Sequence, residues 1–233
     1  MAKLKDNHKL ILFVLALFPF LLFGVFKMVF RDAQNDLIST FSYPHKKFPI
    51  GLDTTDYSGN KIVDTLYHKI PDFKFQNQFG QYISNEAYSN KIYIADFFFT
   101  SCPVQCPKMT KQMRNLQDEF IRDDRIMFAS FSIDPARDSV QKLKTYADEY
   151  GVIPGKWNLL TGDRDKLFYM ARKGFKLSAA DQKDGESEII HSDRFVLVDP
   201  NGNIRGFYIG TDEDAVKHLK GDLALLLTEY KKK

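Results

Sequence analysis

The two cysteines of this 233-residue chain, Cys102 and Cys106, lie four positions apart where a strand pattern gives way to a helix pattern. The apolar run 92–99 leads into the pair, and residues with helical spacing follow it. Two thiols this close can form a disulfide with each other or bind one soft metal ion, and both reactions begin with a thiolate. The pair therefore belongs to a fold that combines strands and helices.

Pro107 constrains where the following helix begins, because a proline inside a helix clashes with the carbonyl four residues back. Proline is tolerated at the first helical position, which places Cys106 at or near the N-cap. We expect the helix dipole to favour a thiolate at Cys106, with Cys102 as a second candidate. The structural alternative is that both cysteines are small buried residues, or that they form a permanent structural link without a chemical role.

A metal at this dithiol needs further ligands from elsewhere in the chain. Thiolates select Cu(I), Zn or iron–sulfur clusters, and a structural Zn site needs four protein ligands. Two thiolates and one imidazole would suffice for Cu(I). His191 lies near the start of the apolar strand pattern 189–198, after the polar stretch 178–187, so it is the candidate third ligand. The alternative is a structural histidine that is satisfied by hydrogen bonds. The other histidines are His8, His45, His68 and His218.

Strands and helices alternate along the chain from residue 72 onward. The predicted strands are 73–75, 82–83, 91–99, 125–133, 158–160, 189–198 and 203–209. The predicted helical segments are 84–88, 107–121, 138–150, 163–174 and 211–227, with Asp138 and Thr211 as helix caps. This order predicts an α/β fold in which a mixed sheet is flanked by helices on both faces. A thioredoxin-like layout satisfies it.

The N-terminal part carries an apolar run of 17 residues, 10–26. About 20 residues of helix cross a bilayer core of about 30 Å, so the run predicts an N-terminal transmembrane helix. A cleaved signal peptide is an alternative, but large residues around Gly24 make a poor cleavage site. A buried core helix is disfavoured because the run is apolar on all sides. More lysines precede the run than follow it, which favours an N-terminus in the cytoplasm and the main domain outside.

The chain is thus expected to have three parts: a membrane anchor (1–31), a tether (32–69) and a thioredoxin-like domain (70–233). The composition, 44% hydrophobic and 27% charged, is that of a globular protein. The formal net charge is only +3, and no clustered basic stretch argues for a nucleic-acid partner. The tether shows prolines and glycines without sustained periodicity.

Three sequence blocks together resemble the Sco/SenC family. They are FFTSCPVQCP (98–107), SIDPARD (132–138), and His191-Ser192 followed by VDPNG (198–202). The similarity runs from about residue 70 to residue 227. The resemblance implies a membrane-anchored, thioredoxin-like domain outside the cytoplasm that binds copper. Such proteins deliver copper to the binuclear copper centre of cytochrome c oxidase, or reduce the cysteines of that centre.

The resemblance also implies the site. The copper ligands of the family fall on Cys102, Cys106 and His191, and the aspartate of its second block falls on Asp134, which is expected beside the ligands or at a partner contact. One departure is visible, because members of the family often have an aspartate where this chain has Ile190. Met109 and Met113 offer soft sulfur, but their helical spacing favours packing in the core.

Several functions compete for this dithiol. The first is a copper-binding protein whose partner is the copper-centre subunit of cytochrome c oxidase. The second is a thiol–disulfide reductase that uses Cys102 and Cys106 without metal. A peroxidase of the peroxiredoxin type is disfavoured, because its motif would place Pro and Thr where this chain has Ala95 and Phe99. An inactive scaffold is disfavoured by the intact ligand set. Without an Arg-rich organellar presequence, the expected location is the bacterial inner membrane, with a single span and the domain facing the periplasm or exterior.

Overall fold

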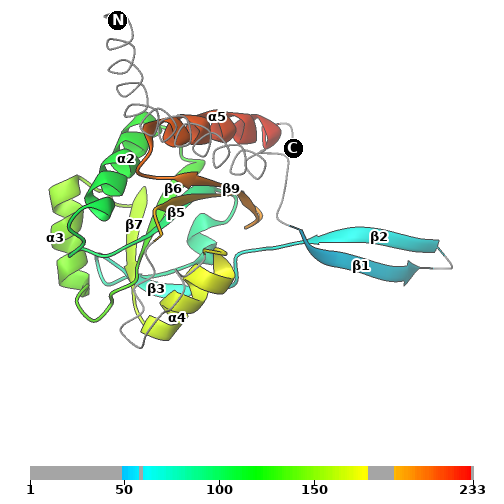
Figure 1. The fold of residues 1–233 in the computed structure, drawn as a ribbon, viewed down its shortest axis with the longest axis horizontal. Helices are drawn as coiled ribbons and strands as arrows, with labels where there is room; N and C mark the ends of the chain where they lie inside the picture. Colours follow the sequence, from blue (N-terminus) through cyan, green and yellow to red (C-terminus); the bar gives the residue numbers. More distant parts are fainter. Residues whose placement is uncertain (1–48, 58–59, 178–191, 232–233) are drawn as a thin grey trace, which may run out of the picture. The chain divides into compact units, whose positions relative to one another are not determined.

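A seven-stranded mixed sheet organises the computed structural model, which describes residues 49–57, 60–177 and 192–231 (Figure 1). The strands are β1 (Pro49–Tyr57), β2 (Asn60–Tyr67), β3 (Lys74–Asn77), β4 (Tyr82–Ser84), β5 (Ile92–Phe98), β6 (Ile126–Ser132), β7 (Trp157–Thr161), β8 (Arg194–Val198) and β9 (Ile204–Ile209). The helices are the 3-10 turn η1 (Asn85–Tyr88), α2 (Gln105–Glu119), α3 (Val140–Tyr150), α4 (Arg164–Tyr169), the π-helical η2 (Met170–Gly174) and α5 (Glu213–Glu229).

The order of the strands in the large sheet is β4-β3-β7-β6-β5-β8-β9. The central strands β5, β6 and β7 are parallel, and the outer strands pair antiparallel. Every residue of β5 is buried. Because successive side chains of a strand point to opposite faces, full burial of β5 means that both faces of the sheet are covered. The predicted thioredoxin-like mixed α/β fold is confirmed.

The parallel strands also place the functional segments. Strands β5, β6 and β7 run in the same direction, so their carboxyl ends lie at one edge of the sheet. The dithiol follows β5, residues 133–138 follow β6, and α4 follows β7. In open α/β sheets this edge is where ligands usually bind. Segments far apart in the sequence are therefore neighbours along one edge.

Three helix starts differ from the sequence expectation. Helix α2 begins at Gln105, two residues before Pro107. Proline is tolerated there because N–H groups of the first helical turn have no acceptor within the helix. Ser139, not Asp138, caps α3, since its side chain accepts the N–H of Lys142 at 3.2 Å. In the same way Asp212, not Thr211, caps α5. In both pairs the neighbouring residue is also a good cap, so the sequence alone favours neither.

The segment expected to be an irregular tether contains regular structure. Strands β1 and β2 form a separate two-stranded antiparallel sheet, with Pro49 opposite Tyr67 and Tyr57 opposite Asn60. Together the two strands contain three Thr, two Ile and one Val, which favour extended structure. The irregular composition of the whole segment concealed that signal. The boundaries of the three proposed parts of the chain remain predictions.

In the ranges 49–57, 60–177 and 192–231, no helix combines the length and the apolar character needed to cross a membrane. The predicted membrane segment, 10–26, lies outside these ranges.

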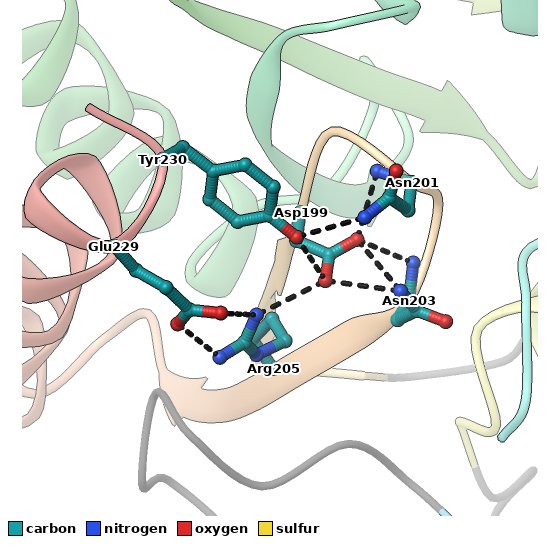
Figure 2. Close-up of polar contacts among 6 residues, drawn as sticks. All are labelled: Asp199, Asn201, Asn203, Arg205, Glu229 and Tyr230. Atoms are coloured by element: carbon teal, nitrogen blue, oxygen red, sulfur yellow. Dashed lines mark hydrogen bonds and ion pairs between the residues drawn. The ribbon is translucent and has the colours of Figure 1, made fainter. Parts of the chain in front are cut away.

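A buried polar network joins the β8–β9 turn to the end of α5 (Figure 2). The Asp199 carboxylate, 1% exposed, accepts hydrogen bonds from the backbone and side chain of Asn203 and from the hydroxyl of Tyr230. It also pairs with Arg205 at 3.0 Å, and Arg205 pairs with Glu229 at 2.7 Å. The guanidinium of Arg205 thus bridges two carboxylates. The network fixes β8, the strand that follows residue 191.

Removing Asp199 is expected to be costly, because the buried donors of Asn203, Arg205 and Tyr230 lose their shared acceptor. For Asp199→Ala we expect a loss of roughly 3–5 kcal/mol in the free energy of unfolding. The matched control is Asp118→Ala, which breaks the exposed pair with Arg114 and should cost less than about 1 kcal/mol. Urea unfolding of both variants measures the difference. Equal costs would show that the network does not stabilise the fold.

Candidate functional site: the dithiol

The dithiol lies at the start of α2 as two free, buried thiols. Cys102 is 9% exposed and Cys106 is 6% exposed. The backbone N–H of Cys106 donates to the Sγ of Cys102 at 3.3 Å, and the N–H of Cys102 donates to the carbonyl of Phe99 at 3.2 Å. The sulfur of Cys102 therefore occupies the position of a helix cap, where the amides of the first turn point.

Asp138 holds the loop that precedes the dithiol. Its side chain is 0% exposed and accepts the hydroxyl of Thr100 at 2.5 Å and the backbone N–H of Thr100 at 3.2 Å. It also accepts the hydroxyl of Ser132 at 2.6 Å. Asp138 thus joins the loop after β5 to the end of β6. We expected a helix cap here; the adjacent Ser139 takes that role and leaves Asp138 for this contact.

The two thiols differ in acidity. Burial opposes ionisation of Cys102, but hydrogen bonds from the amides of Cys106, Val104 and Gln105 outweigh it, so the pKa of Cys102 is lowered. Burial raises the pKa of Cys106 far above its usual value, and its contacts with Cys102 and the charge of Asp96 act in the same direction. The expectation that the thiolate forms preferentially at Cys106 is therefore wrong. The amides of the helix start point at Cys102.

This asymmetry predicts which cysteine reacts first. Near neutral pH, iodoacetamide should modify Cys102 at least about tenfold faster than Cys106, because only the thiolate is nucleophilic. Both residues fall on one tryptic peptide, and fragmentation in the mass spectrometer locates the label. In concentrated urea the two rates should converge, since burial and the helix amides are lost. Preferential labelling of Cys106 in the folded chain would contradict the assignment.

Asp96 is a buried acid that the sequence analysis missed. It lies in the middle of β5, is 1% exposed, and its Oδ1 has no hydrogen-bond partner among the described residues. Burial raises the pKa of Asp96 to about 7, while an interaction with the hydroxyl of Ser130 works against this rise. The charge of Asp96 acts on Cys106. In the sequence, this buried acid is indicated only by its position as the single acid in an otherwise apolar strand.

The raised pKa of Asp96 makes folding less favourable as the pH rises. Between the usual value of 3.8 and about 7 the unfolded chain has lost this proton and the folded chain has kept it, so stability falls with pH in this window. We therefore expect Asp96→Asn to stabilise the fold at pH 8, by at most about 4 kcal/mol at about 1.4 kcal/mol per pKa unit. The gain should vanish near pH 4.

Urea unfolding of wild type and Asp96→Asn across pH 4 to 8 checks this prediction. The control is Asp118→Asn, which makes the same change on the exposed face of α2. A stabilisation by Asp96→Asn that is the same at pH 4 and pH 8 would mean that Asp96 does not titrate between them.

The structure places Asp134 at the same edge as the dithiol. It follows β6, its backbone N–H donates to the hydroxyl of Ser132 at 3.1 Å, and its carboxylate forms an ion pair with Arg137. Its predicted position beside the ligands or at a partner contact stays a prediction. Met109 and Met113 are 1% and 0% exposed, so their predicted packing in the core is confirmed.

His191 lies outside the described residues. Of the other histidines, His68 is buried with its Nε2 2.6 Å from the carbonyl oxygen of Gly174, and burial lowers the pKa of His68. His218 is exposed on α5. Across the part of the chain that the structure describes, no three His, Cys, Asp or Glu side chains are grouped to hold a metal ion. Cys102 and Cys106 are thus two of the three predicted ligands, and the third is not described.

The strand after residue 191 begins close to α2. Strand β8 runs antiparallel to β5, with Ala95 opposite Val196 and Tyr93 opposite Val198, so β8 starts at the edge where β5 ends. A Cβ on Gly210, beside this start, would lie 3.0 Å from the ring of Phe195 and 3.2 Å from the Cε of Met109. Met109 is three residues after Cys106 on α2. Phe195 of β8 and Met109 of the dithiol helix therefore both lie beside Gly210.

A dithiol at the end of the central strand of such a sheet defines a thioredoxin-like protein with a thiol site. The chain matches the sequence model of the SCO1/SenC family over residues 64–223 and belongs to that family.

Named relatives agree with this assignment. The SCO1 protein homolog of Bacillus subtilis is 33% identical over 167 residues, which cover 71% of this chain and 86% of the relative. A protein of Stutzerimonas stutzeri, provisionally named a copper-binding protein, is 32% identical over 142 residues, 59% of this chain and 67% of the relative. The solved structure of BsSco is similar with a TM-score of 0.55 and 32% identity, over 66% of this chain and 93% of that chain. BsSco is described as a member of the Sco family of cytochrome c oxidase assembly proteins with a disulfide switch.

Proposed function

We propose that this chain binds one copper ion through Cys102, Cys106 and His191 and delivers it to the copper-centre subunit of cytochrome c oxidase. The observation that carries the proposal is the reduced thiol pair at the edge of the sheet, in which backbone amides lower the pKa of Cys102. The start of β8, three residues after His191, lies near α2, because Phe195 of β8 and Met109 of α2 both lie beside Gly210. The names of the Stutzerimonas stutzeri protein and of BsSco support copper and oxidase assembly.

The two thiols have different tasks in this proposal. Cys102 is the more readily ionised sulfur and makes the first bond to copper. Cys106 must release its proton when it joins the site, so copper binding is coupled to proton release. Thiolates are soft ligands that prefer Cu(I). Copper is the cargo, and it leaves when thiols of the partner replace these ligands one at a time.

The surroundings of the dithiol suit contact with a partner protein. Val104, between the two cysteines, is 57% exposed, although both thiols beside it are buried. Asp134 and Arg137 lie at the same edge as an exposed ion pair. An apolar tip with charged neighbours has the composition of a contact area for the oxidase subunit. The apolar run 10–26 would anchor the chain as a single span in the bacterial inner membrane, with the domain on the periplasmic or outer side.

The third ligand is tested by His191→Ala. We expect the affinity for Cu(I) to fall by more than about 100-fold, because even residues that only support metal ligands change affinity 10–100-fold. Competition with a Cu(I) chelator measures the affinity, and absorption and EPR spectra with Cu(II) report the change of ligands. His218→Ala on the exposed face of α5 is the matched control and should bind copper as the wild type does. Unchanged affinity and stoichiometry in His191→Ala would refute the three-ligand site.

The second candidate function is reduction of a disulfide in a partner protein, and the lowered pKa of Cys102 favours it. The Cys102 thiolate attacks the partner disulfide, forms a mixed disulfide and releases one partner thiolate. Cys106 then loses its proton and attacks the Sγ of Cys102, which releases the second partner thiolate. The partner gains two electrons, and this chain ends with a Cys102–Cys106 disulfide. The disulfide switch described for BsSco supports such a state.

The same His191→Ala variant separates the two functions. Reduction of a partner disulfide needs no imidazole, so its rate should be unchanged in this variant while copper affinity falls. If copper delivery is the main role, His191→Ala should also fail to restore the copper centre of the oxidase subunit. Cys106→Ser should trap the mixed disulfide if the reductase reaction occurs.

A further inference from the structure

The turn that presents Cys102 is held from the side by the carboxylate of Asp138. This turn follows β5 and is closed by the hydrogen bond from the N–H of Cys102 to the carbonyl of Phe99 at 3.2 Å. Thr100 and Ser101 are its two central residues. Ser101 is exposed, whereas Thr100 donates both its N–H and its hydroxyl to Asp138. The direction in which the turn presents Cys102 is therefore fixed at Asp138.

Phe99, the first residue of this turn, reaches both cysteines through its backbone. Its carbonyl accepts the N–H of Cys102. A hydrogen bond between its backbone and Cys106 lowers the pKa of that thiol, although burial raises it more. Thr100 follows directly, and one peptide group joins it to Phe99. A displacement of Thr100 therefore moves backbone groups that reach both sulfurs.

Asp138 is itself held in place on two sides. Its backbone N–H donates to the carbonyl of Asp134 at 2.9 Å, and the next residue, Ser139, caps α3. Its carboxylate accepts the hydroxyl of Ser132 at 2.6 Å, at the end of β6. Strand β6 pairs in parallel with the whole of β5. The turn after β5 is thus anchored to the neighbouring strand by a side chain that cannot easily shift.

The surroundings of Asp138 indicate more than a stabilising role beside a helix. Burying a carboxylate is unfavourable unless hydrogen bonds replace its contacts with water. Among the described residues three groups donate to it: the N–H of Thr100, the hydroxyl of Thr100 and the hydroxyl of Ser132. Two of the three belong to the turn of the dithiol. The start of α3 does not need them, because Ser139 already caps that helix.

We propose that Asp138 is a positioning residue for the dithiol, which acts through Thr100 to place the sulfur of Cys102 against the amides at the start of α2. This role rests on the proposed function, in which Cys102 makes the first bond to copper or attacks the disulfide of a partner. The N–H of Cys106 reaches the Sγ of Cys102 at 3.3 Å. Hydrogen bonds weaken steeply when their geometry changes, so a loosened turn makes Cys102 a weaker nucleophile.

The charge of Asp138 and its hydrogen bonds have opposite effects on Cys102, which makes the proposal testable. A carboxylate disfavours a nearby thiolate by its charge alone, so loss of the charge would make Cys102 more reactive. Loss of the anchor would make it less reactive. Asp138→Asn removes the charge but keeps an oxygen acceptor for Thr100, and its amide can donate to the hydroxyl of Ser132. Asp138→Ala removes both the charge and the anchor.

The experiment measures the rate at which iodoacetamide labels Cys102 in the reduced, copper-free full chain in a non-ionic detergent near neutral pH. In Asp138→Ala we expect labelling to be at least about fivefold slower, the effect of one typical hydrogen bond on the thiolate. Asp138→Asn should react at or above the wild-type rate. The matched control is Ser139→Ala, which loses the adjacent cap of α3 and some stability but should label Cys102 as the wild type does. Melting curves confirm that each variant is folded under these conditions.

The outcomes that overturn the proposal are distinct. If Asp138→Ala melts at a lower temperature but labels at the wild-type rate, Asp138 only stabilises the fold. If both Asp138 variants label faster, its charge acts and not its hydrogen bonds. If Asp138→Ala does not fold, Thr100→Val, which loses only the hydroxyl contact, must slow the labelling, and an unchanged rate refutes the proposal. Absence of a preference for Cys102 in the wild type would refute the proposed function as well, whereas a preference that survives Asp138→Ala refutes the role of Asp138 alone.

Discussion

The hydrogen bond from the Cys106 amide to the Cys102 sulfur determines how this site can work. It places one sulfur where the amides of the helix start converge, and it leaves the other sulfur inside the first turn of α2. The pKa of Cys102 falls because these amides outweigh burial, while burial raises the pKa of Cys106. Two chemically identical residues thereby become an attacking thiol and a protected thiol. Both proposed functions use that order of events.

Three buried aspartates around the sheet show how the fold supports this arrangement. Asp138 accepts hydrogen bonds from Thr100 and Ser132, and Asp199 is satisfied by its own turn, Tyr230 and Arg205. Both are fully paired, as buried charges in stable folds usually are. Asp96 differs, because one of its oxygens is buried without a partner. A group that costs stability next to the dithiol is typical of a functional site, where strain and perturbed acidity tend to gather.

Much of the fold could be predicted from the sequence because its strands are buried on both faces. Mostly apolar runs such as 92–99 and 125–133 indicate central parallel strands that are buried on both faces. The helix caps were less certain, since Asp138 and Ser139 are adjacent and capping residues compete locally. The β1–β2 sheet was not predicted, because the prolines and glycines of residues 32–69 obscure the strand pattern within that segment. The relative acidity of the thiols was mispredicted because it depends on depth of burial, which the spacing of Cys102 and Cys106 does not reveal.

The functional residues of this chain lie together because of the direction of the strands, and not because they are close in sequence. The parallel strands β5 and β6 end at one edge, so the dithiol, Asp134 and Asp138 lie along it although they span more than 30 residues. The antiparallel β8 adds its first residue to the same edge. A reversal of β8 alone would carry the residues before Arg194 to the opposite end of the sheet. The proposed copper site therefore depends on the pairing of β8 with β5, which the Asp199 network secures at the far end of the strand.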